Sequence, residues 1–245
     1  MRSWIEFWDS EHAIYVNDRH KHLHAQSVGR DIARHIRAPD ATVLDHGCGE
    51  ALYAADVAAQ CGRLILCEAA PAVRSKLAAR LAGHQKISVV GPEGVAEQPD
   101  NALDLVIANS LVQYLTRGEL AMLLDGWRRK LRPGGELIVA DVIPPEVSRV
   151  TDALALLRFA WSGGFLGAAV FGLVRTAFSE YGKIRSELGF SMYREGEFLS
   201  LLRAHGYDAE RIQPNFGHNQ TRMTFRGVRP VSPGRGGPRA DGIRS

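Results

Sequence analysis

The stretch "VLDHGCGEAL", residues 43–52, decides the fold of this sequence. A short apolar run ends in Asp45, and Gly47 and Gly49 follow with one residue between them. Glycines directly after a strand let the backbone approach a ligand closely, and the start of the next helix presents free N–H groups. The stretch therefore predicts a strand, a ligand-binding turn and a helix, in that order.

Outward from this stretch, short apolar segments alternate with helical ones. We expect strands at residues 42–45, 63–68, 86–90, 102–109 and 136–143, and helices at 51–60, 70–82 and 116–131. Thr116 and Glu119 have the spacing of a capping box, and "RPGG" at 132–135 predicts a turn. Such alternation indicates right-handed crossovers on a parallel sheet. The fold class is therefore α/β, a doubly wound and mostly parallel sheet with helices on both faces.

The flanking regions complete this core. Strand patterns at 209–213 and 221–228, after a helix at 194–206, predict a hairpin that adds an antiparallel last strand. The expected organisation is an N-terminal helical lid (1–40, with helix from about 3 to 37), a core (41–145), a helical insert that forms a lid (146–193), a C-terminal helix and hairpin (194–230) and a disordered tail (231–245).

The glycine turn and two acids indicate which ligand binds. A dinucleotide site would need a third glycine where this chain has Leu52, and Asp45 would repel a diphosphate. S-adenosylmethionine carries an ammonium and a sulfonium group without phosphate, so Asp45 would attract it. Glu68 ends the second strand about twenty residues after the turn, where a carboxylate accepts the hydroxyls of an adenosine ribose.

Four segments in order, "VLDHGCGEA", "LILCEA", "ALDLVIANSLVQYL" and "KLRPGGELIVADV", resemble class I S-adenosylmethionine-dependent methyltransferases. The small-molecule branch, with the ubiquinone and menaquinone C-methylases, is the most similar in appearance. The resemblance covers roughly residues 41–143 and implies a Rossmann-like fold, with S-adenosyl-L-methionine as cofactor and S-adenosyl-L-homocysteine as product.

The resemblance also implies the cofactor contacts. Asp45, His46, Gly47 and Gly49 would hold the methionine portion, while Glu68 would bind the ribose with Ala69 beside the adenine. Pro92 and Glu93 stand where the family usually has Asp-Ala near the adenine amino group. Asn109, Ser110 and Leu111 follow the fourth strand, where backbone carbonyls usually meet the methionine amino group. Position 51, often a third glycine in the family, is Ala51 here.

Histidines in the N-terminal region are the candidate catalytic groups. His20 and His24 are four residues apart, so they share one helix face, and an O–H or activated C–H acceptor needs a base such as histidine. Tyr15 and Arg19 would face the methionine carboxylate or the acceptor from the same helix. We expect no metal, because a third ligand of known geometry is missing and Asn109 replaces the acid of metal-dependent O-methyltransferases of this fold.

An apolar segment, Phe159 to Val174, lies in the insert between Arg158 and Arg175. It is shorter than the ~18–20 residues that span a bilayer. Three interpretations stay open: a lid over an apolar acceptor pocket, which we favour, a helix pair lying on a membrane surface, or a homodimer face.

Charge and cysteine content exclude other classes. The net charge of +3 arises beyond residue 228, where four arginines face one aspartate, so the body is nearly neutral and nucleic acid is not an expected partner. Three cysteines without CxxC spacing, and acids at positions 6, 9 and 11, favour a reducing, cytoplasmic location, with peripheral membrane contact if the insert binds lipid.

The predicted function is methyl transfer to a small apolar acceptor, such as a quinone, isoprenoid, polyketide or lipid-like molecule, by in-line displacement. Two alternatives are a peripheral membrane methyltransferase acting on a lipid headgroup and a non-catalytic cofactor-binding partner of another enzyme.

Overall fold

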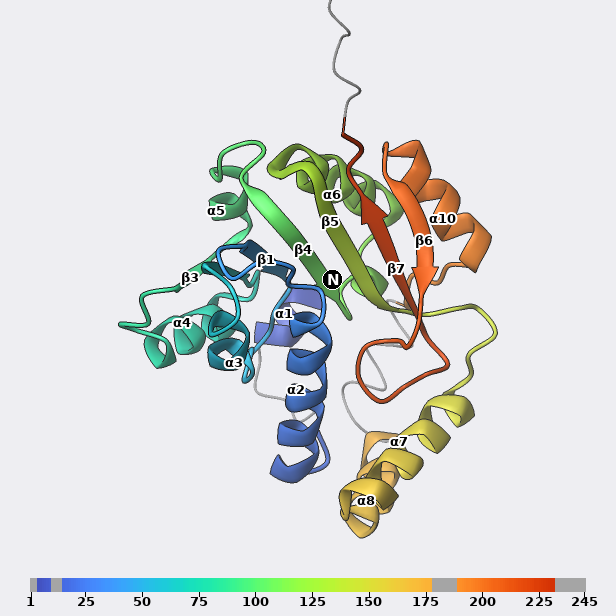
Figure 1. Cartoon of the computed structure of the whole chain (residues 1–245). Coiled ribbons are helices and arrows are strands. Elements are labelled where there is room, and N and C mark those ends of the chain that lie inside the picture. The colour runs from blue at the N-terminus through green and yellow to red at the C-terminus, as the bar shows by residue number, and fades with distance from the viewer. Residues whose placement is uncertain (1–3, 10–14, 178–188, 232–245) are drawn as a thin grey trace, which may run out of the picture.

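A computed structural model describes residues 4–9, 15–177 and 189–231. Seven strands form one sheet in the order β3-β2-β1-β4-β5-β7-β6 (Figure 1). Their bounds are β1 Thr42–His46, β2 Arg63–Cys67, β3 Ile87–Val90, β4 Leu103–Asn109, β5 Leu131–Val142, β6 Asp208–Ile212 and β7 Met223–Val228. Strands β2 and β3 are added on one side of β1, and β4 and β5 on its other side. The first βα turn therefore lies at a topological switch point.

The expected sheet is confirmed. Strands β1 to β5 pair in parallel, and β7 pairs antiparallel to both β5 and β6. The predicted turn at 132–135 is wrong, because these residues belong to β5. Gly134 N–H donates to the carbonyl of Arg229 (2.8 Å), and Arg229 N–H donates to the carbonyl of Gly135 (2.9 Å). These bonds extend the ladder with the end of the hairpin, which local turn chemistry does not reveal.

Helices cover both faces of the sheet (Figure 1). On one face α5 (Pro92–Ala96), α6 (Arg117–Lys130) and α10 (Glu195–Ala204) pack around the buried Trp127 and Phe198. On the other face α2 (Asp18–Ala33), α3 (Ala54–Ala58) and α4 (Pro71–Arg80) pack against Val43, Leu66 and Ile107. The predicted capping box of α6 is present, and a short 3₁₀ helix, η1 (Val112–Tyr114), precedes it.

The N-terminal region, expected to be helical from about residue 3 to 37, is divided into separate helices. It forms α1 (Trp4–Asp9) and the separate α2. Asn17 is in an extended conformation, and its side-chain oxygen accepts a hydrogen bond from His20 N–H (2.8 Å). A side-chain cap of this kind starts a new helix at Asp18.

The insert forms two helices, α7 (Arg149–Gly163) and α8 (Leu166–Ala177), beside α2 and beyond the carboxyl end of β5 (Figure 1). Gly164, with φ of 71°, ends α7. A Cβ at Gly172 would lie 2.3 Å from Val16 Cγ1, so this glycine permits close packing beside α2. The helix pair has its own small core around Ala160, Phe165 and Ala169, and its role as a lid over an acceptor stays a prediction.

Two expectations concern other parts of the chain. The predicted disordered tail lies outside the described residues, apart from Val231. In the described part of the chain, no helix is both long and apolar enough to cross a bilayer.

Candidate functional site

The turn after β1 is tied to the end of β2. The N–H groups of Gly47 and Cys48 both donate to the carbonyl of Cys67 (2.8 and 3.1 Å). Gly49 N–H donates to one oxygen of the Glu68 carboxylate (2.9 Å), and Ala70 N–H donates to the other (2.8 Å). A carboxylate oxygen accepts more than one hydrogen bond, so Glu68 retains capacity for two ribose hydroxyls. The geometry therefore fits the predicted contact to adenosine.

The backbone of this turn needs glycine. Gly47 and Gly49 have φ of 79° and 57°, and a Cβ on Gly47 would lie 3.0 Å from Leu111 Cδ1. Leu111 follows β4, so two of the predicted segments meet here. Ala51 also has a positive φ, of 40°, at the position where the family often has glycine.

Asp45 is buried, with 1% of its surface exposed, and accepts a hydrogen bond from the Tyr53 hydroxyl (2.6 Å). Burial raises its pKa to about 7, although the bond from Tyr53 opposes the shift. Among the described residues, no lysine, arginine or histidine forms an ion pair with Asp45. A buried carboxylate without a cationic partner is destabilising, and a bound ammonium group would compensate it.

His46 faces the opposite side of the sheet from Asp45. Trp127 Nε1–H donates to its Nδ1 (3.0 Å), and burial lowers its pKa to about 4. Its ring therefore supports the core beneath the turn, and a contact to the cofactor would have to come from its backbone.

The remaining predicted cofactor residues lie at the same edge of the sheet. Ala69 directly follows Glu68, Pro92 and Glu93 begin α5 after β3, and Asn109 ends β4. Ser110 has φ of 53°, which is strained for a residue with a side chain. Its hydroxyl donates to Asp141 (2.7 Å), which has φ of 63° at the end of β5. Strained neighbours at two adjacent strand ends are typical of a functional edge.

His20 and His24 do share a helix face, and the structure adds a third histidine. Ring-centroid distances are 6.4 Å between His20 and His24, 6.0 Å between His20 and His218, and 5.8 Å between His24 and His218. The Tyr15 ring contacts His20 and His24. The Nδ1 atoms of His24 and His218 are buried without a hydrogen-bond partner. The rings stack on lid residues, His20 on Phe165 and His218 on Phe159.

Burial keeps these histidines neutral. It lowers the pKa of His20 to about 4 and that of His218 to about 3, with neighbouring histidines adding to the shift. The pKa of His24 is also lowered by burial, but the charges of Asp141 and Asp31 oppose that shift.

Sequence reasoning missed His218, in the loop between β6 and β7. The stretch "PNFGHNQ" contained a polar, glycine-bearing loop with a histidine, but only the fold carries it to α2. Gly217 N–H donates to Asp31 of α2 (2.9 Å), which holds the loop there. The guanidinium of Arg19 donates to the carbonyl of Gly163 at the end of α7, and the predicted contact of Arg19 with a ligand stays a prediction.

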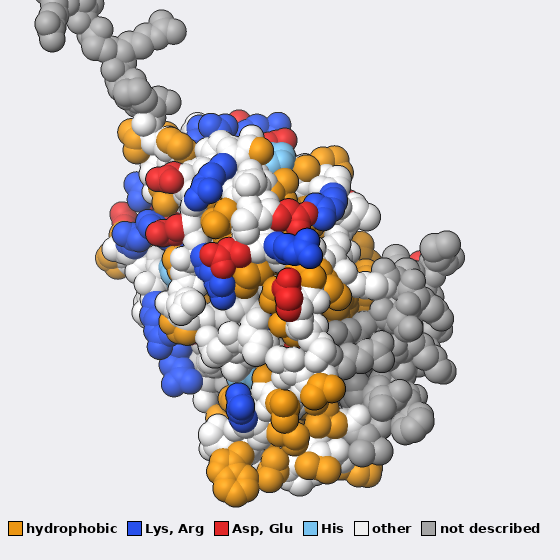
Figure 2. Space-filling view, turned by 90° about the vertical axis from the view of Figure 1, so that its right-hand side faces the viewer, with side chains coloured by type: hydrophobic (Ala, Val, Ile, Leu, Met, Phe, Trp, Pro, Cys, Tyr) orange, Lys and Arg blue, Asp and Glu red, His pale blue; other side chains and the backbone are white. Residues whose placement is uncertain are grey.

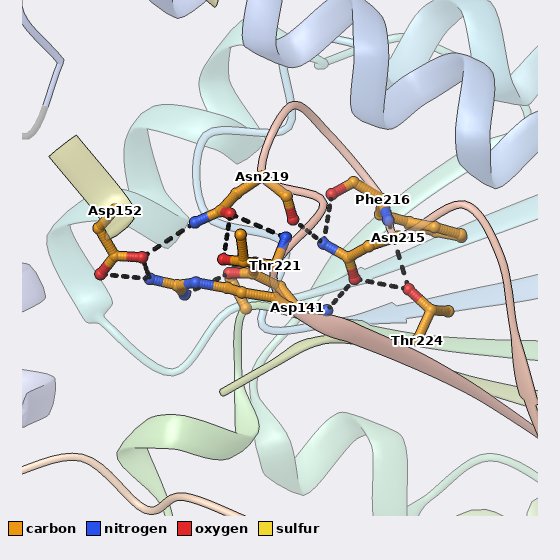
Figure 3. A network of polar contacts seen from close by, with 9 residues as sticks. Asp141, Asp152, Asn215, Phe216, Asn219, Thr221 and Thr224 are labelled. Carbon is orange, nitrogen blue, oxygen red and sulfur yellow. Dashed lines mark hydrogen bonds and ion pairs between the residues drawn. The ribbon is translucent and has the colours of Figure 1, made fainter. Parts of the chain in front are cut away.

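A polar network joins this loop to the lid and to β5 (Figure 3). Arg222 donates to Asp141 (2.9 Å) and to both oxygens of Asp152 in α7 (3.3 and 3.2 Å). The side chain of Asn219 also donates to Asp152 (2.9 Å), and the side-chain oxygen of Asn215 accepts the N–H of Asp141 (3.1 Å).

No group of three or more His, Cys, Asp or Glu among the described residues is arranged to hold a metal ion. The expected absence of a metal stays a prediction.

Comparison with known proteins agrees with this geometry. A family model described as "Methyltransferase domain" matches residues 43–135, from β1 to the start of β5. No curated protein matches the chain.

Solved structures share the fold. A chain from the complex of the Haloferax volcanii Trm112 methyltransferase activator with a putative methyltransferase has a TM-score of 0.60 at 12% identity, covering 94% of this chain and 100% of that one. Magnesium protoporphyrin IX methyltransferase from Synechocystis PCC 6803, with bound S-adenosylhomocysteine, has a TM-score of 0.56 at 14% identity and 92% coverage of each chain. The 1,6-didemethyltoxoflavin N1-methyltransferase of Burkholderia thailandensis has a TM-score of 0.52 at 17% identity, covering 83% of this chain and 79% of that one.

The domain match lies over the turn and acids described above, and the fold extends through the hairpin. The chain therefore contains a methyltransferase domain at residues 43–135, within a fold that it shares with these solved methyltransferases.

Proposed function

We propose that the chain transfers a methyl group from S-adenosylmethionine to a small, apolar acceptor bound under α7 and α8. The observation that carries the proposal is the buried carboxylate of Asp45, which has no cationic partner among the described residues and lies beside the glycine turn. The apolar rings of Phe159 and Phe165 on the lid side support an acceptor with substantial apolar surface.

The chain's own residues would bind and orient the reactants. Asp45 attracts the ammonium group of the cofactor, and Glu68 accepts its ribose hydroxyls. When bound, the cofactor supplies an electrophilic methyl group on a sulfonium. The packed lid excludes water, and orientation of this kind contributes up to ~7–11 kcal/mol in ideal cases. For an acceptor that must lose a proton, His24 receives it in this proposal, while His20 and His218 line the same space.

Calorimetry with S-adenosylhomocysteine tests the cofactor site. We expect Glu68→Ala to weaken binding roughly 10- to 100-fold, because hydrogen bonds to a charged acceptor contribute about 1.5–3 kcal/mol. Glu97→Ala, at an exposed position that follows α5, is the control and should bind like the wild type. An unchanged dissociation constant for Glu68→Ala, with folding verified by its melting temperature, would remove the ribose assignment.

The acceptor class is tested with labelled S-adenosylmethionine and three probes. These are a hydroquinone with a decyl tail, hydroquinone without a tail, and decylamine. Labelled product from the tailed hydroquinone, in clear excess over the untailed one, supports the apolar acceptor. Equal labelling with and without the tail would contradict it, and labelling of decylamine alone would remove the role of His24.

A second candidate, a peripheral membrane methyltransferase, is favoured by the outer face of the lid. Trp161 and Phe171 are 76% and 71% exposed, near the exposed Val150, Leu154 and Val170. Figure 2 shows hydrophobic side chains gathered at the end of the molecule that α7 and α8 occupy. Flotation with vesicles of phosphatidylcholine and phosphatidylglycerol tests it, with a Trp161→Ser/Phe171→Ser variant as control. The candidate fails if the wild type stays in the soluble fraction.

A further inference from the structure

The guanidinium of Arg222 connects β5 with α7. In the proposed function, the carboxyl end of β5 belongs to the cofactor site and α7 covers the acceptor. One nitrogen donates to Asp141 at the end of β5 (2.9 Å), and the other lies 3.2 Å from a carboxylate oxygen of Asp152 in α7. All three side chains are largely buried, with 12%, 16% and 19% of the Arg222, Asp141 and Asp152 side chains exposed. Ion pairs this far from water are screened little by salt and are sensitive to the loss of one partner.

The contact with Asp141 connects Arg222 to the carboxyl ends of β1, β2 and β4. We call these strand ends the donor edge, because the methyl donor would bind there in the proposed function. Asp141 accepts the Ser110 hydroxyl on the same oxygen that Arg222 binds. Both aspartate and serine are in the left-handed region, which the surrounding structure must hold in place. Ser110 follows β4 directly, beside the predicted contacts of the methionine amino group.

The Asp152 arm leads to the lid. Asp152 lies in the first turn of α7, which begins after the Ser148 cap. Asn219 donates to the same carboxylate, so the loop between β6 and β7 holds this end of the helix twice. At the other end of α7, Arg19 binds the carbonyl of Gly163.

We infer that Arg222 is a positioning residue: it holds the amino-terminal end of lid helix α7 in register with the strand ends at Ser110 and Asp141. Arg222 contacts neither reactant. It fixes the distance between the acceptor lid and the donor edge. Binding of the cofactor at the donor edge therefore also stabilises α7. The inference rests on the proposed function in taking α7 as the acceptor lid.

Hydrogen–deuterium exchange of amides 149–163, measured with and without S-adenosylhomocysteine, tests the inference. Asp152→Asn keeps the shape of the side chain and its bond from Asn219 but removes the charge. We expect exchange in α7 to rise about tenfold or more, while the dissociation constant of S-adenosylhomocysteine changes less than threefold. We also expect the ligand to slow exchange in α7 of the wild type and to lose that effect in Asp152→Asn.

Variants of Arg222 itself and of a second arginine complete the test. Arg222→Lys, which retains the charge without the two-armed donor, should accelerate exchange in α7 less than Arg222→Met does. Arg226→Met, four residues further along in β7, is the matched control, because Arg226 pairs with Glu136 and Glu210 instead (2.6 and 2.9 Å). It should leave α7 exchange at the wild-type rate.

Wild-type exchange rates in α7 of both Asp152→Asn and Arg222→Met would overturn the inference, as would equal effects of Arg222→Met and Arg226→Met. A wild-type protein that does not bind S-adenosylhomocysteine would instead contradict the proposed function. The exchange rates without ligand would then still decide whether Arg222 fastens the lid.

Discussion

At the scale of single residues, Asp45 shows that binding and stability make opposite demands. Its carboxylate is buried with one hydrogen bond, from Tyr53, and burial raises its pKa to about 7. The charged form is therefore unfavourable in the free protein and becomes favourable when a cation binds beside it. If Asp45 binds the ammonium group of the cofactor as proposed, the same carboxylate both attracts the cofactor and destabilises the unliganded chain at neutral pH.

Asp45→Asn should separate these effects. The amide oxygen still accepts the Tyr53 hydroxyl, but the attraction for an ammonium group is lost. We expect S-adenosylhomocysteine to bind roughly 10- to 100-fold more weakly at pH 8, in line with the loss of one charge-assisted contact. Wild-type affinity should fall as the pH drops below about 7 and Asp45 becomes protonated, whereas the variant should lack this part of the pH dependence.

Calorimetry across pH 6–8.5 measures both effects. Glu50→Gln is the control, since Glu50 stands in the same turn but pairs with Lys21 at the surface. Equal affinities of wild type and Asp45→Asn at pH 8 would show that Asp45 does not contact the ammonium group.

At the scale of elements, the glycines in helices have different roles that the sequence does not distinguish. A Cβ at Gly126 in α6 would meet nothing within 4 Å, whereas one at Gly172 in α8 would lie 2.3 Å from Val16. Glycine inside a helix is less favourable than alanine by about 0.5–1 kcal/mol. Of these two positions, only Gly126 can gain that difference without a clash.

We therefore expect Gly126→Ala to raise the melting temperature, by about 1–4 °C for a chain of this size. Gly172→Ala should lower it, because α8 would have to move away from Val16. Thermal unfolding followed by circular dichroism checks both variants. A rise in both would mean that α8 does not pack on the segment before α2 as described.

At the scale of the whole molecule, three distant segments assemble the histidine cluster: α2 supplies His20 and His24, the hairpin loop supplies His218, and the lid supplies the stacking rings. The folded-state pKa of His218 is about 3, below the ordinary value of 6.5, so the unfolded chain binds the proton between these values. Stability from the neutral ring is therefore present above pH 6.5 and is lost as the pH falls, by about 2 kcal/mol at pH 5 for one such histidine.

His218→Phe should accordingly reduce the fall in melting temperature between pH 7 and pH 5, since a phenyl ring can stack on Phe159 without titrating. Asp45 has the opposite sign, because its raised pKa adds stability as the pH falls through about 7. Asp45→Asn should thus steepen the same fall. Parallel pH profiles for the wild type and both variants would show that neither group titrates as its burial requires.

Much of the core follows from local pattern. Apolar runs, turn glycines and helix caps specify β1 to β4, α4 and α6 through interactions between residues close in the chain, so these elements were predictable. Asp45 lies near the end of β1, Glu68 and Leu111 follow β2 and β4, and parallel strands bring their carboxyl ends to one edge. That is why a cofactor edge was visible in the sequence alone.

The sequence by itself determined the sheet and the switch point, and it placed the carboxylates of Asp45 and Glu68 at one edge of that sheet. Only the tertiary structure decided the extension of β5 through residues 132–135, the place of His218 and the double pairing of Arg222. These features depend on contacts between residues 60 to 190 positions apart, such as Asp152 with Arg222 and Asp31 with Gly217. No short-range pattern encodes such contacts, because each forms only after the sheet has brought the partners together.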